Sequence, residues 1–176
     1  VGAYTVFANK GIRVEPLFVT RIEDSYGNTI ANFTPQMSEV LTEDASYKML
    51  HMLKSVIDGG TGGRVRFRYG IKAEMGGKTG TTQNNSDGWF MGFTPSLVSG
   101  CWVGGEDRSI HFDRLAEGQG ASMALPIYAL YMQKVYKDKT LGYSEDETFE
   151  IPEKYANPCS EGGEEDSPTT PPDTGG

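Results

Sequence analysis

The chain has 176 residues, of which 37% are hydrophobic and 11% aromatic, and this suits one packed domain of ordinary size. It has neither a run of about 18 apolar residues nor a basic stretch before an apolar one, so we expect no membrane-spanning helix and no signal peptide. The formal charge of −8 comes from residues 145–176, which carry ten acids and one lysine, while residues 1–144 carry +1. No basic stripe offsets the acidic tail, so nucleic acid is not an expected partner.

The chain opens with the pattern of a helix end. Apolar residues recur at helical spacing before Gly11, which predicts a stop: Val1, Tyr4, Phe7 and Ala8. We interpret residues 1–10 as the last turns of a helix that begins upstream. The sequence is therefore expected to be a C-terminal piece of a longer protein.

A hairpin and a helix are predicted next. Residues 17–24 and 29–33 have strand character and flank the turn at 25–28. Thr42 is a suitable N-cap for a helix that Gly59 ends. The expected buried face of this helix consists of Ala45, Met49, Met52, Leu53, Val56 and Ile57. After it, Arg64, Arg66 and Arg68 alternate with apolar residues, and we favour a strand with one solvated face over an anion-binding patch.

Three strands are predicted over 76–83, 88–94 and 97–104. Their short polar connections indicate antiparallel neighbours. A final helix is expected over 121–138, with Pro126 near its first turn. Its apolar positions recur at spacings of three and four: Leu125, Tyr128, Ala129, Met132, Val135 and Tyr136. After about residue 155, Gly, Pro, Ser, Thr and acidic residues predict a disordered tail.

The cysteines and histidines suggest no special chemistry. Cys101 and Cys159 are too few for a disulfide scaffold, and Cys101 is expected to be a small core residue of a strand. His51 and His111 are isolated, and no His/Cys cluster has the spacing of metal ligands. We therefore expect neither a metal nor a cofactor.

The stretch MGGKTGTT, residues 75–82, carries the most specific chemistry. A phosphate-binding loop would need a glycine where Lys72 stands and should open a helix, whereas the sequence here favours a strand. In a strand, Thr79 and Thr81 share one face while Lys78 and Gly80 share the other. Hydroxyls, backbone N–H groups and a nearby ammonium form a good carboxylate site, and the same edge could bind an extended peptide.

Several motifs in order identify a family resemblance. The stretches GGKTGTT, DGWFMGFTP, WVGGED and ASMALPIYALYM, preceded by YTVFANKG, FVTRIEDSYGNTI and LKSVIDGGTGG, resemble the C-terminal half of the transpeptidase domain of a class A penicillin-binding protein. The resemblance covers roughly residues 1–140. It implies an α+β fold: part of the serine β-lactamase/transpeptidase-like fold, mainly antiparallel sheet flanked by helices, without the helical lobe that carries the nucleophile.

Such domains are acyl-serine enzymes with Ser-x-x-Lys, Ser-x-Asn and Lys-Thr-Gly motifs. This chain contains the third motif and neither of the first two. By resemblance, Lys78 supports proton movement near the nucleophile and attracts the substrate carboxylate. Thr79 and Thr81 bind that carboxylate, the N–H of Thr81 forms half of the oxyanion hole, and Gly80 keeps the strand clear of the nucleophile's helix. The neighbouring Thr82 is included among the expected substrate-binding residues.

The resemblance implies a peptidoglycan D,D-transpeptidase that cross-links stem peptides ending in D-Ala-D-Ala and is acylated by β-lactams. The fragment alone is expected to be inactive, with residues 1–155 belonging to the transpeptidase domain and 156–176 to the tail. The full protein is expected at the periplasmic face of the inner membrane, anchored by its missing N-terminal part. Alternatives are a D,D-carboxypeptidase or β-lactamase of the same fold, or a non-catalytic module that binds cell-wall peptides.

Overall fold

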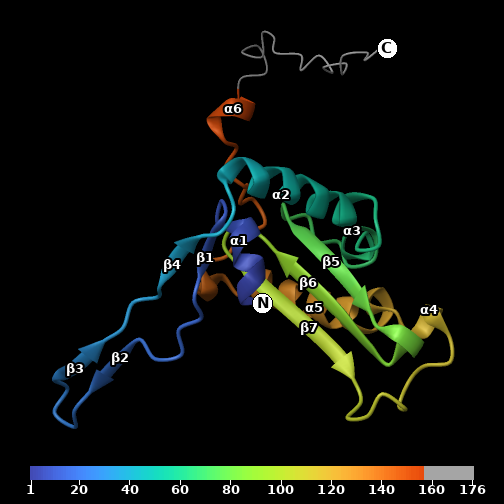
Figure 1. Cartoon of the computed structure of the whole chain (residues 1–176), viewed down its shortest axis with the longest axis horizontal. Helices are drawn as coiled ribbons and strands as arrows, with labels where there is room; N and C mark the ends of the chain where they lie inside the picture. The colour runs from blue at the N-terminus through green and yellow to red at the C-terminus, as the bar shows by residue number, and fades with distance from the viewer. Residues whose placement is uncertain (157–176) are drawn as a thin grey trace, which may run out of the picture.

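The computed structural model describes residues 1–156, shown in Figure 1. The first half contains helix α1 (Thr5–Ala8), strands β1 (Ile12–Val14), β2 (Arg21–Glu23), β3 (Thr29–Asn32) and β4 (Met37–Glu39), and helices α2 (Glu43–Asp58) and α3 (Arg64–Phe67). The second half contains strands β5 (Gly76–Thr81), β6 (Asp87–Phe93) and β7 (Val98–Gly104), and helices α4 (Leu115–Gly118), α5 (Gly120–Lys137) and α6 (Glu153–Ala156). The predicted tail lies almost wholly outside the described residues.

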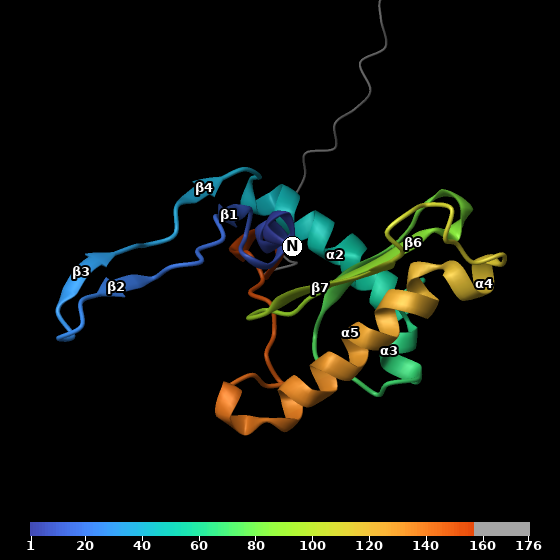
Figure 2. The same ribbon diagram turned by 90° about the horizontal axis from the view of Figure 1, so that it is seen from below.

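The three strands β5, β6 and β7 form one antiparallel sheet in that order, as the sequence predicts. Helix α5 covers one face, where Tyr128 lies against Phe90 with ring centroids 4.8 Å apart. On the other face, Trp89 of β6 is paired with Trp102 of β7, and both side chains are almost half exposed. Helix α2 packs beside β5, as Figures 1 and 2 show.

The core has two parts. The larger lies between α5, the sheet and the segment that follows α3, and it is built on Ile57, Val65, Ile71, Met75, Phe90, Leu125, Tyr128 and Met132. The six predicted apolar positions of the last helix are all buried. The smaller part consists of Leu50 and Leu53 of α2, Phe93 of β6 and Phe149. The N-terminal turns pack against it through Tyr4, Phe7 and Ala8. Because α5 begins at Gly120, one residue before the predicted start, Pro126 is its seventh residue and lies in the second turn of the helix.

Strands β1–β4 form a long two-stranded arm that extends away from the body (Figure 2). The predicted hairpin is confirmed, although its strands are shorter than expected. Asp24 stabilises the turn by accepting hydrogen bonds from the N–H groups of Tyr26 and Asn28, both at 2.8 Å. Many of the arm's large apolar side chains are exposed, among them Phe18, Ile22, Tyr26, Ile30 and Met37.

The buried face of α2 differs from the predicted one. Thr42 caps the helix as expected, since its hydroxyl accepts from the Ala45 N–H at 3.2 Å. However, Met49 and Met52 are exposed, and the buried stripe consists of Ser46, Leu50, Leu53 and Ile57. Ser46 can occupy this stripe because its hydroxyl donates to the carbonyl of Val6 at 3.2 Å. A prediction based on apolar residues alone misses this buried face, because Ser46 is polar and its hydroxyl is hydrogen-bonded to a residue of α1.

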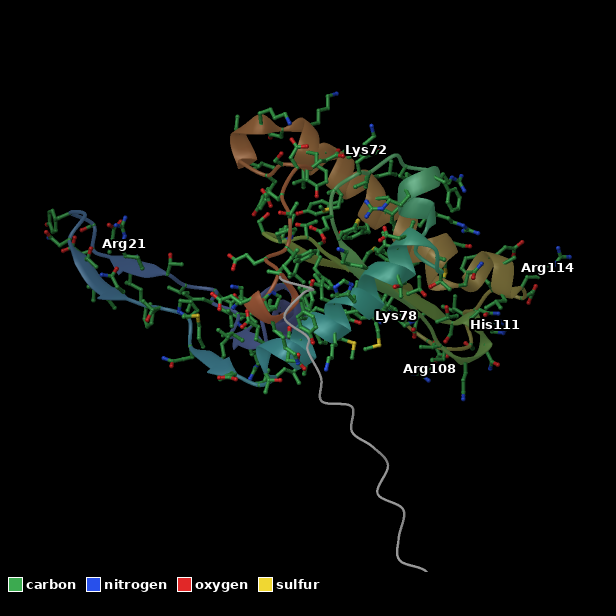
Figure 3. All side chains as sticks on the ribbon, turned by 90° about the horizontal axis from the view of Figure 1, so that it is seen from above. Arg21, Lys72, Lys78, Arg108, His111 and Arg114 are labelled. Carbon is green, nitrogen blue, oxygen red and sulfur yellow. The ribbon has the colours of Figure 1, made fainter. Side chains whose placement is uncertain are left out.

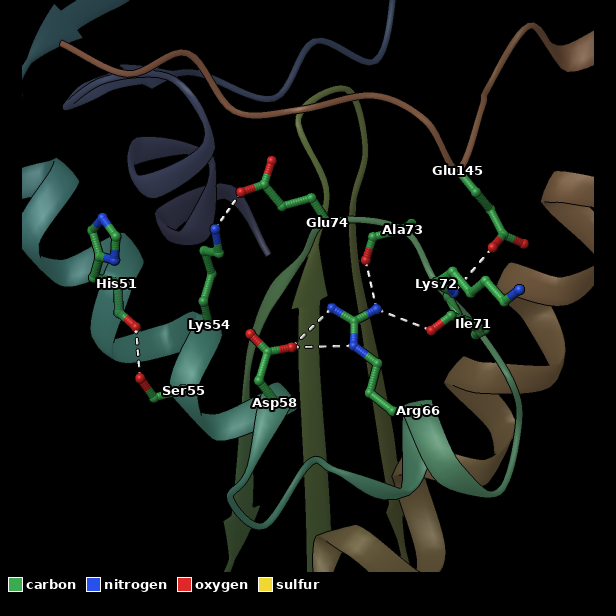
Figure 4. Close-up of polar contacts among 10 residues, drawn as sticks. All are labelled: His51, Lys54, Ser55, Asp58, Arg66, Ile71, Lys72, Ala73, Glu74 and Glu145. Atoms are coloured by element: carbon green, nitrogen blue, oxygen red, sulfur yellow. Dashed lines mark hydrogen bonds and ion pairs between the residues drawn. The ribbon is translucent and has the colours of Figure 1, made fainter. Parts of the chain in front are cut away.

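The arginine segment is a short helix, so the predicted alternating strand is wrong. The N–H groups of Val65 and Arg66 donate to the carbonyls of Gly62 and Gly63, which closes helical turns. Arg66 contacts Asp58 and donates to the carbonyls of Ile71 and Ala73 at 2.9 and 2.6 Å (Figure 4). The guanidinium therefore holds the connection to β5 in place instead of forming a solvated strand face.

The segment after α5 returns across the molecule and contacts α2. Glu74 accepts from the Phe149 N–H at 2.8 Å and pairs with Lys54, a pair that Figure 4 shows. Farther on, the Tyr155 hydroxyl donates to Asp44 at 2.5 Å, and its ring stacks on Tyr47. The hydrogen bond from Tyr155 is the first cause of the lowered pKa of Asp44. These contacts hold the returning segment against α2 as far as Tyr155.

Two further observations concern the described part alone. None of the helices within residues 1–156 is long and apolar enough to cross a membrane. Over the same residues, no group of three or more His, Cys, Asp or Glu side chains is arranged to hold a metal ion. Several basic side chains lie on separate parts of the molecule, from Arg21 on the arm to Arg108 and Arg114 around the loop before α4, as Figure 3 shows.

Candidate active site

Strand β5 lies at the edge of the three-stranded sheet, paired with β6 on one side only. The Thr82 N–H, just beyond the strand, donates to the carbonyl of Asp87 on the β6 side at 3.1 Å. Backbone groups alternate in direction along an extended strand, so the N–H and C=O groups of Thr79 and Thr81 point away from β6. These groups therefore face the open edge, where a ligand or an added strand can reach them.

Lys78 brings its positive charge to the same edge. Its side chain is exposed, and its Nζ donates to the carbonyl oxygen of Thr79 at 2.8 Å. Since that carbonyl points away from β6, the ammonium lies beside the outward N–H groups and not over the centre of the sheet. Figure 3 shows Lys78 on the body of the molecule, well away from Arg21 on the arm.

Thr79 and Thr81 share the other face of β5, as the alternation predicts, and their register partners are Phe90 and Gly88. The Thr79 hydroxyl is hydrogen-bonded to the hydroxyl of Thr61 at 2.8 Å. The Thr81 hydroxyl accepts from the N–H of Gly120 at 3.0 Å. Each hydroxyl is thus held by a residue from outside the strand.

Thr82 differs from its two neighbours. Its hydroxyl lies within hydrogen-bonding distance of Ser86, and it accepts from the N–H of Asp87 at 3.1 Å. These contacts close the turn between β5 and β6, where Asn84 and Asn85 have positive φ angles. Asp87 is the first residue of β6 and takes part in this turn.

The neighbouring glycine and aromatic residues have distinct environments. A Cβ at Gly80 would lie 3.2 Å from the Cβ of Trp89, so β6 leaves little space above this position. Phe90 is fully buried in the core, whereas Trp89 is 43% exposed. Trp89 therefore lies outside the core. Cys101 is half-buried on β7, and burial raises the pKa of its thiol.

The edge of β5 thus combines one ammonium, outward N–H groups and two oriented hydroxyls. All of these groups can donate hydrogen bonds, and the ammonium adds a positive charge, so the site suits an anionic group such as a carboxylate. An N–H group fixed in space can also stabilise an oxyanion that develops next to the edge. Sequence reasoning missed Thr61 and Gly120, because each reaches β5 only through the tertiary fold.

Comparison with known proteins identifies the family of the chain. A family model described as the penicillin-binding protein transpeptidase domain matches residues 1–100. The chain belongs to the penicillin-binding protein transpeptidase family. The chain is 37% identical over 150 residues to penicillin-binding protein 1A of Aquifex aeolicus, and the match covers 85% of the chain. It is 34% identical over 160 residues to penicillin-binding protein 1A of Rickettsia conorii, with 78% of the chain covered.

The match covers only 19% of the Aquifex protein and 20% of the Rickettsia protein, so the chain spans about a fifth of the length of these relatives. The fold of the penicillin-binding protein chain also resembles the crystal structure of penicillin-binding protein 1A from Haemophilus influenzae. That likeness has a TM-score of 0.73 at 24% identity and covers 87% of this chain and 27% of that one. The α+β architecture is accordingly that of a partial transpeptidase fold.

Proposed function

We propose that this chain supplies one wall of the active site of a D,D-transpeptidase that cross-links peptidoglycan stem peptides. In this proposal residues 1–155 belong to the transpeptidase domain of a class A penicillin-binding protein, and residues 156–176 form a tail. The observation that carries it is the convergence of the Lys78 ammonium with the outward N–H groups of Thr79 and Thr81 at one open strand edge. The family membership and the similarity to penicillin-binding protein 1A support the same reaction.

The substrate would be a stem peptide ending in D-Ala-D-Ala, lying along the open edge of β5 as an added strand. Its terminal carboxylate would bind the hydroxyls of Thr79 and Thr81 and be attracted by Lys78. Gly80, without a side chain, would let the nucleophile's helix approach. Thr82 would contribute mainly by holding the turn, since its hydroxyl is already engaged by Ser86 and Asp87. A β-lactam, which also has a carboxylate beside a reactive carbonyl, would bind in the same way.

The reaction needs a serine nucleophile that attacks the carbonyl of the penultimate D-alanine and releases the terminal one. The Thr81 N–H would donate to the oxyanion of the tetrahedral intermediate, and Lys78 would favour transfer of the serine proton. The acyl group would then pass to an amine on a second strand. This sequence has no Ser-x-x-Lys and no Ser-x-Asn motif, so the nucleophile must come from another part of the longer protein.

Peptidoglycan as the substrate places the full protein in the cell envelope. The periplasmic face of the inner membrane is the expected location, with the membrane anchor in a part of the protein that this chain does not include. Stem peptides and β-lactams are the proposed ligands.

Acylation of the full-length protein by a fluorescent penicillin tests the proposal. Lys78→Met should slow acylation by at least about a hundredfold, since it removes a charge next to the reacting atoms. Lys72→Met is the matched control: Lys72 is exposed, and only its backbone N–H is engaged, by Glu145 (Figure 4). Wild-type acylation in Lys78→Met would contradict the proposed role. The 176-residue chain by itself should show no covalent label, and a serine-linked adduct on it would show that our account of the nucleophile is wrong.

A further inference from the structure

Thr61 stands at the active-site edge although it belongs to no motif of the predicted site. It lies in the connection between α2 and α3, and its side chain is exposed. The flanking glycines hold this loop tightly against its surroundings. A Cβ at Gly60 would lie 2.9 Å from the Cα of Val56, and one at Gly62 would lie 2.9 Å from Cδ1 of Ile57. The backbone that presents Thr61 is therefore closely packed, which favours one position for its hydroxyl.

The Thr61 hydroxyl reaches β5 at one point. Its Oγ1 lies 2.8 Å from Oγ1 of Thr79, so one of the two hydroxyls donates to the other. If Thr61 is the donor, the proton of Thr79 remains free for a ligand. If Thr79 were the donor, its proton would be engaged by Thr61, and a carboxylate of the ligand would face only a lone pair of the Thr79 oxygen. A bound anion therefore favours the arrangement in which Thr61 donates.

Thr81 shows the same arrangement two residues farther along the strand. Its hydroxyl accepts from the Gly120 N–H at 3.0 Å, and a backbone N–H can only donate. The Thr81 proton is consequently left free to donate elsewhere. The hydroxyls of the two threonines on this face of β5 are thus each hydrogen-bonded to a group from another element. The Gly120 N–H of α5 can only donate, and the Thr61 hydroxyl of the α2–α3 loop can donate or accept.

We propose that Thr61 is a positioning residue that sets the specificity of the site for a ligand carrying a free carboxylate. By donating to Thr79, it directs the Thr79 proton toward the open edge, where Lys78 adds positive charge. The hydroxyl of Thr61 itself need not touch the ligand. The inference rests on the proposed function, because it assumes that an anionic ligand group binds at this edge.

The test compares two acylating probes in the full-length protein: a penicillin with a free carboxylate and its methyl ester. The ester keeps the reactive carbonyl but lacks the negative charge. Thr61→Val should lower the second-order acylation rate of the acid about tenfold and leave that of the ester unchanged, since a hydrogen bond that acts through one hydroxyl is worth about a factor of ten. Thr61→Ser, which keeps the donor, should restore the wild-type ratio of the two rates.

Thr34→Val serves as the control, because Thr34 is exposed on the arm. An unchanged acid-to-ester ratio in Thr61→Val, an equal loss with both probes, or a failure of Thr61→Ser to restore the ratio would each overturn the inference. Thr79→Val separates this inference from the proposed function. If Thr79→Val loses the preference for the acid over the ester while Thr61→Val keeps it, the role proposed for Thr61 is wrong and the proposed function is unaffected. If the wild-type protein reacts with neither probe, the proposed function itself fails.

Discussion

The amide nitrogen of Gly120 lies 3.0 Å from the hydroxyl oxygen of Thr81, although 39 positions separate the two residues. Gly120 begins helix α5, and that helix carries Tyr128 and Met132 into the centre of the core. The hydrogen bond therefore connects the main core helix to the strand that we expect to bind substrate. The orientation of Thr81 depends on how closely α5 approaches β5 and β6.

Gly120→Ala should both destabilise the chain and impair acylation of the full-length protein. A Cβ at this position would lie 2.3 Å from the carbonyl oxygen of Gly80 and 2.4 Å from that of Trp89, so α5 would have to move. Overpacking of this kind costs about 1–3 kcal/mol. Urea unfolding measures the stability, and penicillin acylation measures the site. Gly59→Ala is the control with no atom within 4 Å of the added Cβ, and equal stability of the two variants would contradict this close approach.

Arg64→Met should loosen the start of α5. The Arg64 Nη1 donates to the carbonyl of Ala121 and to the hydroxyl of Ser122, both at 3.0 Å, and methionine keeps most of the side chain's apolar length. Loss of these charge-assisted bonds should lower the free energy of unfolding by about 2 kcal/mol. Arg68→Met, at an exposed position over the Tyr69 ring, should lower it by about 0.5 kcal/mol or less. A similar loss in both variants would indicate that Arg64 makes no specific contribution.

Glu74→Ala should release the returning segment near Phe149. Glu74 accepts from the Phe149 N–H and pairs with Lys54, and both side chains of the pair are about three-quarters buried. Removing it should cost about 1–3 kcal/mol and speed proteolysis after residue 142. Glu23→Ala breaks the exposed pair with Arg21 and should change stability by less than about 1 kcal/mol. Unchanged protease resistance in Glu74→Ala would show that other contacts hold this segment.

The free energy of unfolding should fall at alkaline pH, because two buried tyrosines resist deprotonation in the folded chain. Burial raises the pKa of Tyr136 to about 12 from its ordinary value of 10.0, and burial raises the pKa of Tyr128 as well. Between these pH values the unfolded chain binds fewer protons than the folded chain. The contribution of the protonated Tyr136 to the free energy of unfolding is therefore fully present below pH 10 and is lost as the pH rises toward 12.

Urea midpoints measured across that range should decline less steeply in Tyr136→Phe than in the wild-type chain. Tyr26→Phe is the control, because Tyr26 is exposed on the arm and should leave the slope unchanged. An identical slope in Tyr136→Phe would mean that Tyr136 keeps an ordinary pKa in the folded protein.

Local pattern was sufficient for much of the fold. The three sheet strands could be predicted because short polar connections force neighbouring strands to pair antiparallel, and the period of two placed Thr79 and Thr81 on one face. The buried face of α5 followed from spacings of three and four, since nearly all of its core positions are apolar. The grouping of an ammonium and two hydroxyls on β5 likewise followed from the consecutive residues 78–81.

The tertiary structure decided which distant groups meet this edge. The alternating arginines form a helix, because Arg64 and Arg66 find carbonyl and carboxylate partners in other elements that outweigh a preference based on alternation. Thr61 and Gly120 meet Thr79 and Thr81 only because α2 and α5 pack against the sheet. A hydrogen bond between residues 18 or 39 positions apart leaves no periodic trace in the chain, since it depends on packing and not on local backbone geometry.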